Sequence, residues 1–212
     1  MELKNNPELR DSVKYFEHYT ESDKSYMPEE HSWQCEKTLP RLAWAVSVIG
    51  KEGFKSVIDF GCKDGFLPLS LPKYNVEAKG IDISRDAIEL GRERAKKFGL
   101  DVDFQIVTIE DYIDDKKWDC SCLLEVIDRV IDPKKVLNKC REVSDNLLLT
   151  TPDYYGRFGW DDNRNVERLR IYKEPEIKDL LKEYGEIKEF QILDGAYFIY
   201  LKFYKNGKKS KN

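Results

Sequence analysis

"SVIDFGCKDGF", residues 56–66, joins a short apolar run to a turn that holds an acid, a lone cysteine and two glycines. A short apolar run closed by glycine is typical of a buried strand in a parallel sheet. The turn after it has three interpretations: a redox or metal loop around Cys62, a loop that binds phosphate, or the floor of another cofactor pocket. The segments around it decide among them.

Strands and helices alternate after this stretch. Apolar runs predict further strands over 78–83, 102–107, 118–124 and 146–151. Periodic and capped segments predict helices over 64–71, 84–99, 132–143 and 174–185. Two late strands, 186–193 and 196–204, meet at Asp194-Gly195, a hairpin dipeptide. The sequence therefore predicts an α/β fold, with a doubly wound, mostly parallel, seven-stranded Rossmann-like sheet that ends in an antiparallel hairpin.

The chain divides into three parts on this pattern. Residues 1–53 precede the alternating segments and contain an amphipathic stretch at 36–50, so we expect an N-terminal helical extension that acts as a lid. Residues 54–205 form the single α/β domain, and the basic segment 206–212 is expected to be a flexible tail.

Composition limits the classes of function. The net charge of −4 argues against a dedicated nucleic-acid binder. No apolar run approaches the roughly 20 residues of a membrane helix, and the polar N-terminus does not read as a secretory signal. The five cysteines form no C-x-x-C pair. We therefore expect buried, reduced thiols in a cytoplasmic protein.

Acidic residues follow four of the predicted parallel strands, in the order Asp59, Asp82, Glu110 with Asp111, and Glu125. Ligands of open parallel sheets bind beyond the carboxyl ends of the strands. The chain has neither the Walker loop nor the G-x-G-x-x-G fingerprint that would bind phosphates there. Carboxylates around a glycine turn suit a ligand with an ammonium group, ribose hydroxyls and a positive centre.

The segment VIDFGCKDGF resembles motif I, D-x-G-C-x-x-G, of the Rossmann-like S-adenosylmethionine-dependent methyltransferases. Four later segments resemble the ubiquinone-biosynthesis-like branch of that family in the same order: GIDIS, TIEDY, CLLEVIDRVIDPKKVL and LLLTTPD. The resemblance runs from about residue 54 to residue 203. It implies S-adenosylmethionine as cofactor, S-adenosylhomocysteine as product, and a methyltransferase domain over 54–205.

The resemblance also implies roles for single residues. Asp59 would orient the amino group of the cofactor, and Gly61 and Gly65 would let the backbone approach its methionine part. Cys62 would be a small residue that fills the turn, and Asp82 would accept both ribose hydroxyls. The alternative for Asp82 is an acid that only caps the helix after Ser84.

Adenine and sulfonium contacts are implied in the same way. Ile83 and Ile109 would sandwich the adenine, and either Glu110 or Asp111 would accept its exocyclic amine. The residues beside the methionine end and the sulfonium would be Leu124 and Glu125.

The chain departs from the related pattern E-V-I-E-H-V at Arg129, which stands where the pattern has histidine. Arginine does not ligate a cation, so we expect no metal and disfavour a metal-dependent RNA methyltransferase. The same change removes the most obvious general base. His31, Glu125 and Asp128 are the remaining catalytic candidates, and His31 belongs to the predicted lid.

The acceptor is expected to bind to the segment between the fifth strand and the next helix, because loops of about twenty residues are uncommon unless they are functional. The candidate substrate-binding residues are Tyr154, Tyr155, Arg157, Trp160, Arg168 and Arg170. The alternative, that this segment simply packs on the sheet edge, stays open.

The residues and the resemblance together predict a metal-independent methyltransferase that acts on a small-molecule or glycan acceptor, with oxygen as the expected accepting atom. Two alternatives remain: a methyltransferase of RNA or another nucleic acid, and a non-catalytic protein that keeps the methyltransferase fold as a binding or scaffold module.

Overall fold

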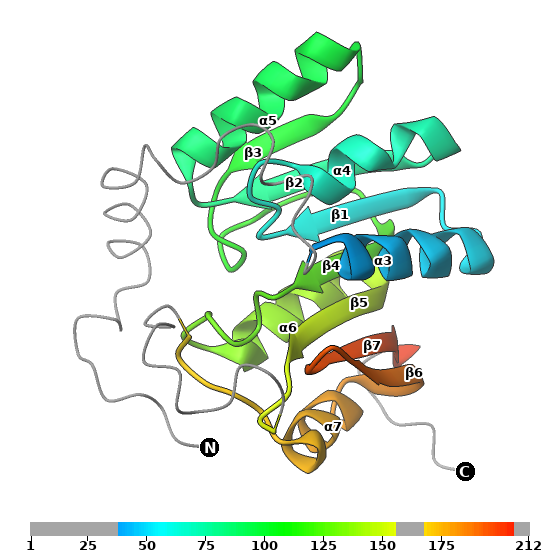
Figure 1. The fold of residues 1–212 in the computed structure, drawn as a ribbon, viewed down its shortest axis with the longest axis vertical. Helices are drawn as coiled ribbons and strands as arrows, with labels where there is room; N and C mark the ends of the chain where they lie inside the picture. Colours follow the sequence, from blue (N-terminus) through cyan, green and yellow to red (C-terminus); the bar gives the residue numbers. More distant parts are fainter. Residues whose placement is uncertain (1–37, 156–167, 206–212) are drawn as a thin grey trace.

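The computed structural model describes residues 38–155 and 168–205 (Figure 1). Of the predicted N-terminal extension, the structure describes the helix α3, Thr38–Glu52, whose buried face includes Ala45, Val48 and Ile49. The rest of the extension, with His31, and the predicted tail lie outside the described residues. The lid and the tail therefore stay predictions.

Seven strands of the described chain form one sheet in the order β3-β2-β1-β4-β5-β7-β6 (Figure 1). They are β1 Ser56–Phe60, β2 Glu77–Asp82, β3 Asp103–Ile106, β4 Trp118–Leu124, β5 Ser144–Pro152, β6 Gly185–Leu193 and β7 Ala196–Phe203. The first five run parallel, and β7 pairs antiparallel with both β5 and β6. The predicted fold class is confirmed. The strand order reverses between β1 and β4, which makes the carboxyl end of β1 the switch point of the sheet.

The helices begin and end close to their predicted positions. They are α4 Phe66–Ser70, α5 Arg85–Phe98, α6 Pro133–Val143 and α7 Glu174–Lys182, with a short 3-10 helix, η2 Pro72–Tyr74, after α4. Ser84 caps α5, where its hydroxyl accepts from the backbone N of Ala87 at 3.2 Å. Asp132 caps α6, where one carboxylate oxygen accepts from the backbone N of Lys134 and Lys135. Both caps satisfy backbone donors that the first helical turn leaves without partners.

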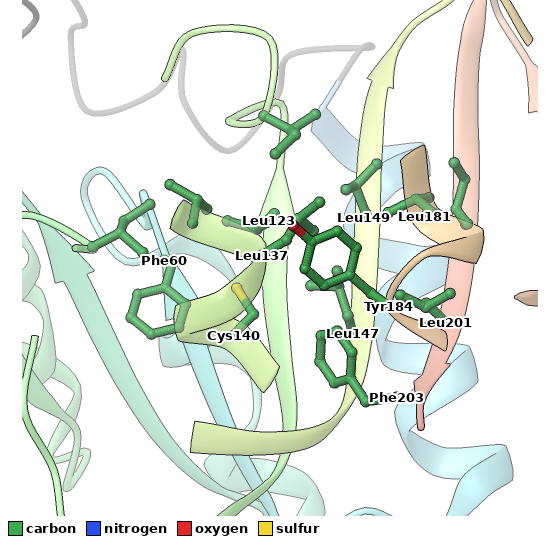
Figure 2. Packing of buried hydrophobic residues seen from close by; sticks show 14 of the residues in the cluster. Phe60, Leu123, Leu137, Cys140, Leu147, Leu149, Leu181, Tyr184, Leu201 and Phe203 are labelled. Carbon is green, nitrogen blue, oxygen red and sulfur yellow. The ribbon is translucent and has the colours of Figure 1, made fainter. Parts of the chain in front are cut away.

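Helices cover both faces of the sheet. One face packs against α6 and α7 in the larger core cluster, which contains Leu137 and Cys140 of α6 and Leu181 of α7 (Figure 2). The other face packs against α3 and α4 in a second cluster. Because the central strands are buried on both faces, they contain consecutive apolar residues, Val57 and Ile58 in β1 and Leu147 to Leu149 in β5, where a half-exposed strand would alternate polar and apolar residues.

The cysteines of the described chain are buried free thiols, as predicted; they are Cys62, Cys120, Cys122 and Cys140. Burial raises the pKa of the Cys140 thiol to about 12, which keeps it protonated at neutral pH. Cys35 lies outside the described residues. No helix in residues 38–155 or 168–205 has the length and apolar character to cross a membrane.

Candidate cofactor-binding site

The turn after β1 is tied to the end of β2. The backbone N atoms of Gly61 and Cys62 both donate to the carbonyl of Ile81, at 2.7 and 3.0 Å. Gly61 and Gly65 have φ angles of 74° and 82°, in the left-handed region that costs other residues free energy. The turn therefore needs glycine at these two positions for conformational reasons alone.

Both glycines also leave room for protein side chains. A Cβ atom on Gly61 would lie 2.5 Å from Cγ2 of Val126, and one on Gly65 would lie 2.4 Å from Cζ of Phe104. Side chains from the loop after β4 and from β3 thus fit directly against the turn. The predicted approach of a cofactor to these glycines is compatible with this packing, but the packing is a separate reason for each glycine.

Asp59 carries a buried carboxylate at the carboxyl end of β1. The residue is 4% exposed, and its Oδ1 atom has no hydrogen-bond partner among the described residues. Burial, and then the nearby charge of Asp82, raise the pKa of this carboxyl well above its usual value. Buried polar atoms are almost always satisfied by a partner. A carboxylate oxygen left without one at a switch point fits a ligand that donates from an ammonium group.

Asp82 holds the turn after β1 to the start of α5. Its Oδ2 accepts from the backbone N of Lys63 at 2.8 Å, and its Oδ1 accepts from the backbone N of Ser84 at 2.9 Å. Burial raises the pKa of Asp82, and these two bonds oppose the rise. Each carboxylate oxygen has a second acceptor site, so both ribose hydroxyls fit the same side chain. Ser84 supplies the helix cap itself, so Asp82 is not there only to cap α5.

The predicted adenine contacts lie on the loops after β2 and β3. Ile83 is half-buried, and Ile109 is 8% exposed because it packs into the larger core cluster. Glu110 and Asp111 are both exposed, and Asp111 Oδ2 accepts from the hydroxyl of Thr108 at 2.8 Å. Either carboxylate is available to an exocyclic amine, and the choice between them stays open.

The loop after β4 begins in a strained backbone conformation. Glu125 has a φ of 64°, which costs a non-glycine residue about 1–2 kcal/mol, and its N atom donates to the carbonyl of Thr150 at 3.0 Å. Leu124, the last residue of β4, is half-buried. The packing of Val126 against Gly61 brings the start of this loop close to the turn after β1. The predicted place of Leu124 and Glu125 beside the methionine end and the sulfonium stays a prediction.

The two catalytic candidates of this loop are joined by an arginine that sequence analysis assigned to the acceptor. Arg168 Nη1 lies 2.5 Å from Asp128 Oδ2, and Arg168 Nη2 lies 3.0 Å from Glu125 Oε2. Asp128 is fully buried. Since a side chain without exposure does not reach an acceptor, this geometry favours a structural role for Asp128 over the predicted catalytic one.

Arg170 also differs from its prediction as an acceptor-binding residue. It is 1% exposed, and its guanidinium donates to the carbonyls of Ile127 and Ile131 at 3.1 and 2.9 Å and to that of Val130. Desolvation lowers the pKa of Arg170. The residue holds the loop after β4 from within the protein. The sequence does not indicate this role, because no local spacing connects residues about forty positions apart.

The remaining predicted acceptor residues lie at the end of β5 or beyond it. Tyr154 and Tyr155 form a T-shaped pair with ring centroids 5.0 Å apart, and Tyr155 is 78% exposed. Lys173 Nζ lies 4.7 Å from the centre of the Tyr154 ring. Arg157 and Trp160 lie outside the described residues.

An acidic and glycine-rich turn at the switch point of a doubly wound sheet defines a Rossmann-like domain that binds a nucleoside-containing cofactor. The model of a family described as "Methyltransferase domain" matches residues 51–193 of the chain. The chain belongs to this family. Its motifs and fold make it a class I, S-adenosylmethionine-dependent member.

Curated relatives include the ubiquinone biosynthesis O-methyltransferase of Pasteurella multocida, which is 30% identical over 100 residues. That match covers 42% of this chain and 41% of the relative, so the chain spans about two fifths of the length of such relatives. The sequence identity is therefore confined to a shared segment and does not extend over the two whole proteins.

Solved structures with a similar fold include the PH0226 protein of Pyrococcus horikoshii OT3, with a TM-score of 0.70 and 18% identity over 85% of this chain and 97% of that chain. The magnesium protoporphyrin IX methyltransferase of Synechocystis PCC 6803, solved with bound S-adenosylhomocysteine, gives a TM-score of 0.69 at 14% identity. It matches 92% of this chain and 96% of its own. At these identities the likeness concerns the fold.

Proposed function

We propose that this protein transfers the methyl group of S-adenosylmethionine to an oxygen atom of a small-molecule acceptor. The proposal rests on one carboxylate oxygen of Asp59, which has no hydrogen-bond partner in the described part of the chain and lies at the switch point of a methyltransferase-family sheet. The names of the curated relatives support the choice of oxygen. A glycan is included among the acceptors that we propose.

The chain's own residues have distinct tasks in this proposal. Asp59 binds the amino group of the cofactor, and Asp82 accepts the ribose hydroxyls while its backbone bonds keep the carboxylate oriented. Ile83 and Ile109 border the adenine, and Glu110 or Asp111 accepts its amine. The cofactor supplies a methyl group made electrophilic by a sulfonium, and no metal ion is part of the proposal.

Orientation and exclusion of water carry most of the catalysis in this proposal. Methyl transfer is an in-line displacement, for which holding two reactants in line replaces a bimolecular encounter. A base is required only where an acceptor hydroxyl must lose its proton. Glu125 already forms an ion pair with Arg168, so we propose that it orients the site. His31 remains the predicted base.

Acceptor recognition is proposed for the segment that starts at Tyr154. The exposed aromatic ring of Tyr155 offers a stacking surface to a planar or sugar-bearing substrate. Arg157 and Trp160 are proposed to belong to the same surface. The buried free thiols support a reducing compartment, and we propose the cytoplasm.

Calorimetric titration with S-adenosylmethionine tests the cofactor assignment. We expect saturable binding to the natural chain and none to Asp82→Ala at up to about 100 times the natural Kd, because the variant loses both ribose contacts and the bonds that hold the turn. Asp145→Ala is the control, since Asp145 is an exposed residue near the start of β5. Near-normal affinity of Asp82→Ala would refute the ribose assignment.

The acceptor is tested separately, by methyl transfer to a panel of phenols, hydroxylated small molecules and sugars. Transfer to one class identifies the acceptor chemistry. Cofactor binding without transfer to that panel or to RNA would instead favour the non-catalytic scaffold.

A further inference from the structure

Arg168 bridges two carboxylates inside the loop after β4. Its two terminal nitrogens bind Asp128 Oδ2 and Glu125 Oε2, at 2.5 and 3.0 Å. The side chain of Arg168 is 6% exposed, and the side chains of Asp128 and Glu125 are 0% and 11% exposed. An arginine fork between two acids is a geometry that a lysine does not reproduce, because a lysine is a single point charge.

The backbone next to Arg168 binds the same loop. The N atoms of Leu169 and Arg170 donate to the carbonyl of Asp128 at 2.9 and 3.2 Å. The Arg170 guanidinium adds bonds to three further carbonyls of the loop. Residues 168–170 therefore hold the loop by side chain and by main chain, although they lie about forty positions later in the sequence.

The loop after β4, which residues 168–170 hold in place, contains the strained and tightly packed part of the site. Glu125 has a left-handed backbone, and the side chain of Val126 occupies the space that Gly61 leaves open. Such a conformation persists only where its surroundings overdetermine it. Its neighbours are the Thr150 carbonyl, which accepts from the Glu125 N, the Arg129 Nε, which donates to the Glu125 carbonyl at 3.0 Å, and the Arg168 guanidinium, which binds the Glu125 carboxylate.

We propose that Arg168 is a positioning residue of the cofactor site. It holds the Glu125 carboxylate in one direction and keeps Val126 seated on Gly61, so that the turn after β1 and the loop after β4 form one surface for the methionine end of the cofactor. This inference rests on the proposed function. It assigns no contact between Arg168 and the cofactor itself.

Arg168 differs from the other residues that bind this loop because it forms an ion pair with a buried carboxylate. Asp128 is fully buried, and its Oδ1 atom has no hydrogen-bond partner among the described residues. Removal of one partner of a buried ion pair leaves an uncompensated charge, which is strongly destabilising. Without Arg168, the loop must either move Asp128 toward water or lose its charge. Either change releases Glu125 and Val126 from their positions.

Calorimetric titration with S-adenosylmethionine, at a temperature where every variant is folded, tests the proposal. We expect the Kd to rise about tenfold or more in Arg168→Met and about threefold in Arg168→Lys. The Arg168→Met/Asp128→Asn double variant should recover part of the loss, because it removes the unpaired buried charge. Arg141→Met, an arginine of α6 that binds Asn138, is the control and should change the Kd less than about twofold.

Thermal unfolding of the same variants separates positioning from general stability. A merely structural role would lower the Tm of Arg168→Met and leave its Kd unchanged below that Tm, and this result would overturn the proposal. A double variant that binds no better than Arg168→Met would overturn it as well. If Arg168→Met does not fold, the Kd values of Arg168→Lys and of the double variant are compared with that of the natural chain. If the natural chain does not bind the cofactor, the proposed function is refuted. If the natural chain binds the cofactor and the variants bind it with the same Kd, only the role of Arg168 is refuted.

Discussion

At the scale of single residues, the site contains two aspartates whose carboxylates lie in different environments. Asp82 has backbone donors on both oxygens, so its charge is partly compensated before any ligand arrives. Asp59 has one oxygen without a partner among the described residues and is desolvated. Binding sites commonly accept such a local loss of stability because the ligand offsets it.

Asp59 gives a pH-dependent prediction. The pKa of the Asp59 carboxyl is higher in the folded chain than in the unfolded chain, so this carboxyl ionises at a lower pH in the unfolded chain. The folded chain therefore loses stability as the pH rises above the usual aspartate pKa. At neutral pH without cofactor, we expect Asp59→Asn to have a higher free energy of unfolding than the natural chain, because the variant has no buried charge at this position. Near pH 4 the difference should vanish, as denaturant titrations at both pH values would show.

The same variant should bind S-adenosylmethionine more weakly, because an amide accepts an ammonium group less well than a carboxylate. Asp145→Asn, at an exposed position, is the matched control and should change neither quantity. An Asp59→Asn chain that is less stable than the natural chain at neutral pH would contradict this account.

The sequence predicts which residues lie at the strand ends, but it does not predict the contacts that these residues make. Asp59, Asp82 and Glu125 were found because acids repeatedly follow apolar runs, a local signal. The bridge from Arg168 to Glu125 and Asp128 joins positions about forty apart, and no period or spacing reports such a pair. Arg168 and Arg170 therefore appeared to belong to the acceptor surface, although both are buried.

At the scale of elements, α5 lies close to the sheet because three glycines surround one ring. A Cβ atom on Gly65, Gly80 or Gly91 would lie 2.4, 2.6 or 3.2 Å from an atom of the Phe104 ring. These glycines come from the turn after β1, from β2 and from α5, and the ring comes from β3. The contact joins four separate parts of the chain at one point. Sequence periodicity predicted each element and not this contact.

Helix α6 gives a prediction about capping. Asp132 accepts two backbone N–H bonds at its start, so Asp132→Ala should lower the free energy of unfolding by about 1 kcal/mol. Asn138→Ala, at an exposed position of the same helix, should change it by less than about 0.5 kcal/mol. Urea titrations followed by circular dichroism measure both. Equal effects of the two variants would argue against the cap.

At the scale of the whole molecule, the parallel sheet with helices on both faces followed from the alternation of elements, whereas the order β3-β2-β1-β4-β5-β7-β6 did not. Parallel strands need crossover helices, and the late hairpin could only add an antiparallel pair. Strand β4, WDCSCLL, carries Asp119 and Ser121 among its apolar residues, and Ser121 is buried with them because helices cover both faces of the sheet. Specific packing between those layers depends on side-chain shape and had no sequence signal.

Thiol reactivity tests this packing. In a Cys35→Ser chain, we expect the four remaining thiols to react with a thiol reagent only as fast as the protein unfolds, because all four are buried and free. All four should react at once in denaturant, which is the control. Rapid reaction of one thiol in the native chain would reveal an opening at that cysteine, with Cys62 in the cofactor turn the most informative case.

The ring of Phe104 and the three glycines around it have a consequence for how this sequence can diverge. A larger side chain at any one of those glycines meets the ring, and a smaller side chain at 104 leaves a void that no single enlargement fills, since the glycines approach it from different elements. Position 104 and its three glycines should therefore be inherited together. Homologues that lose one of them should carry a compensating change at another.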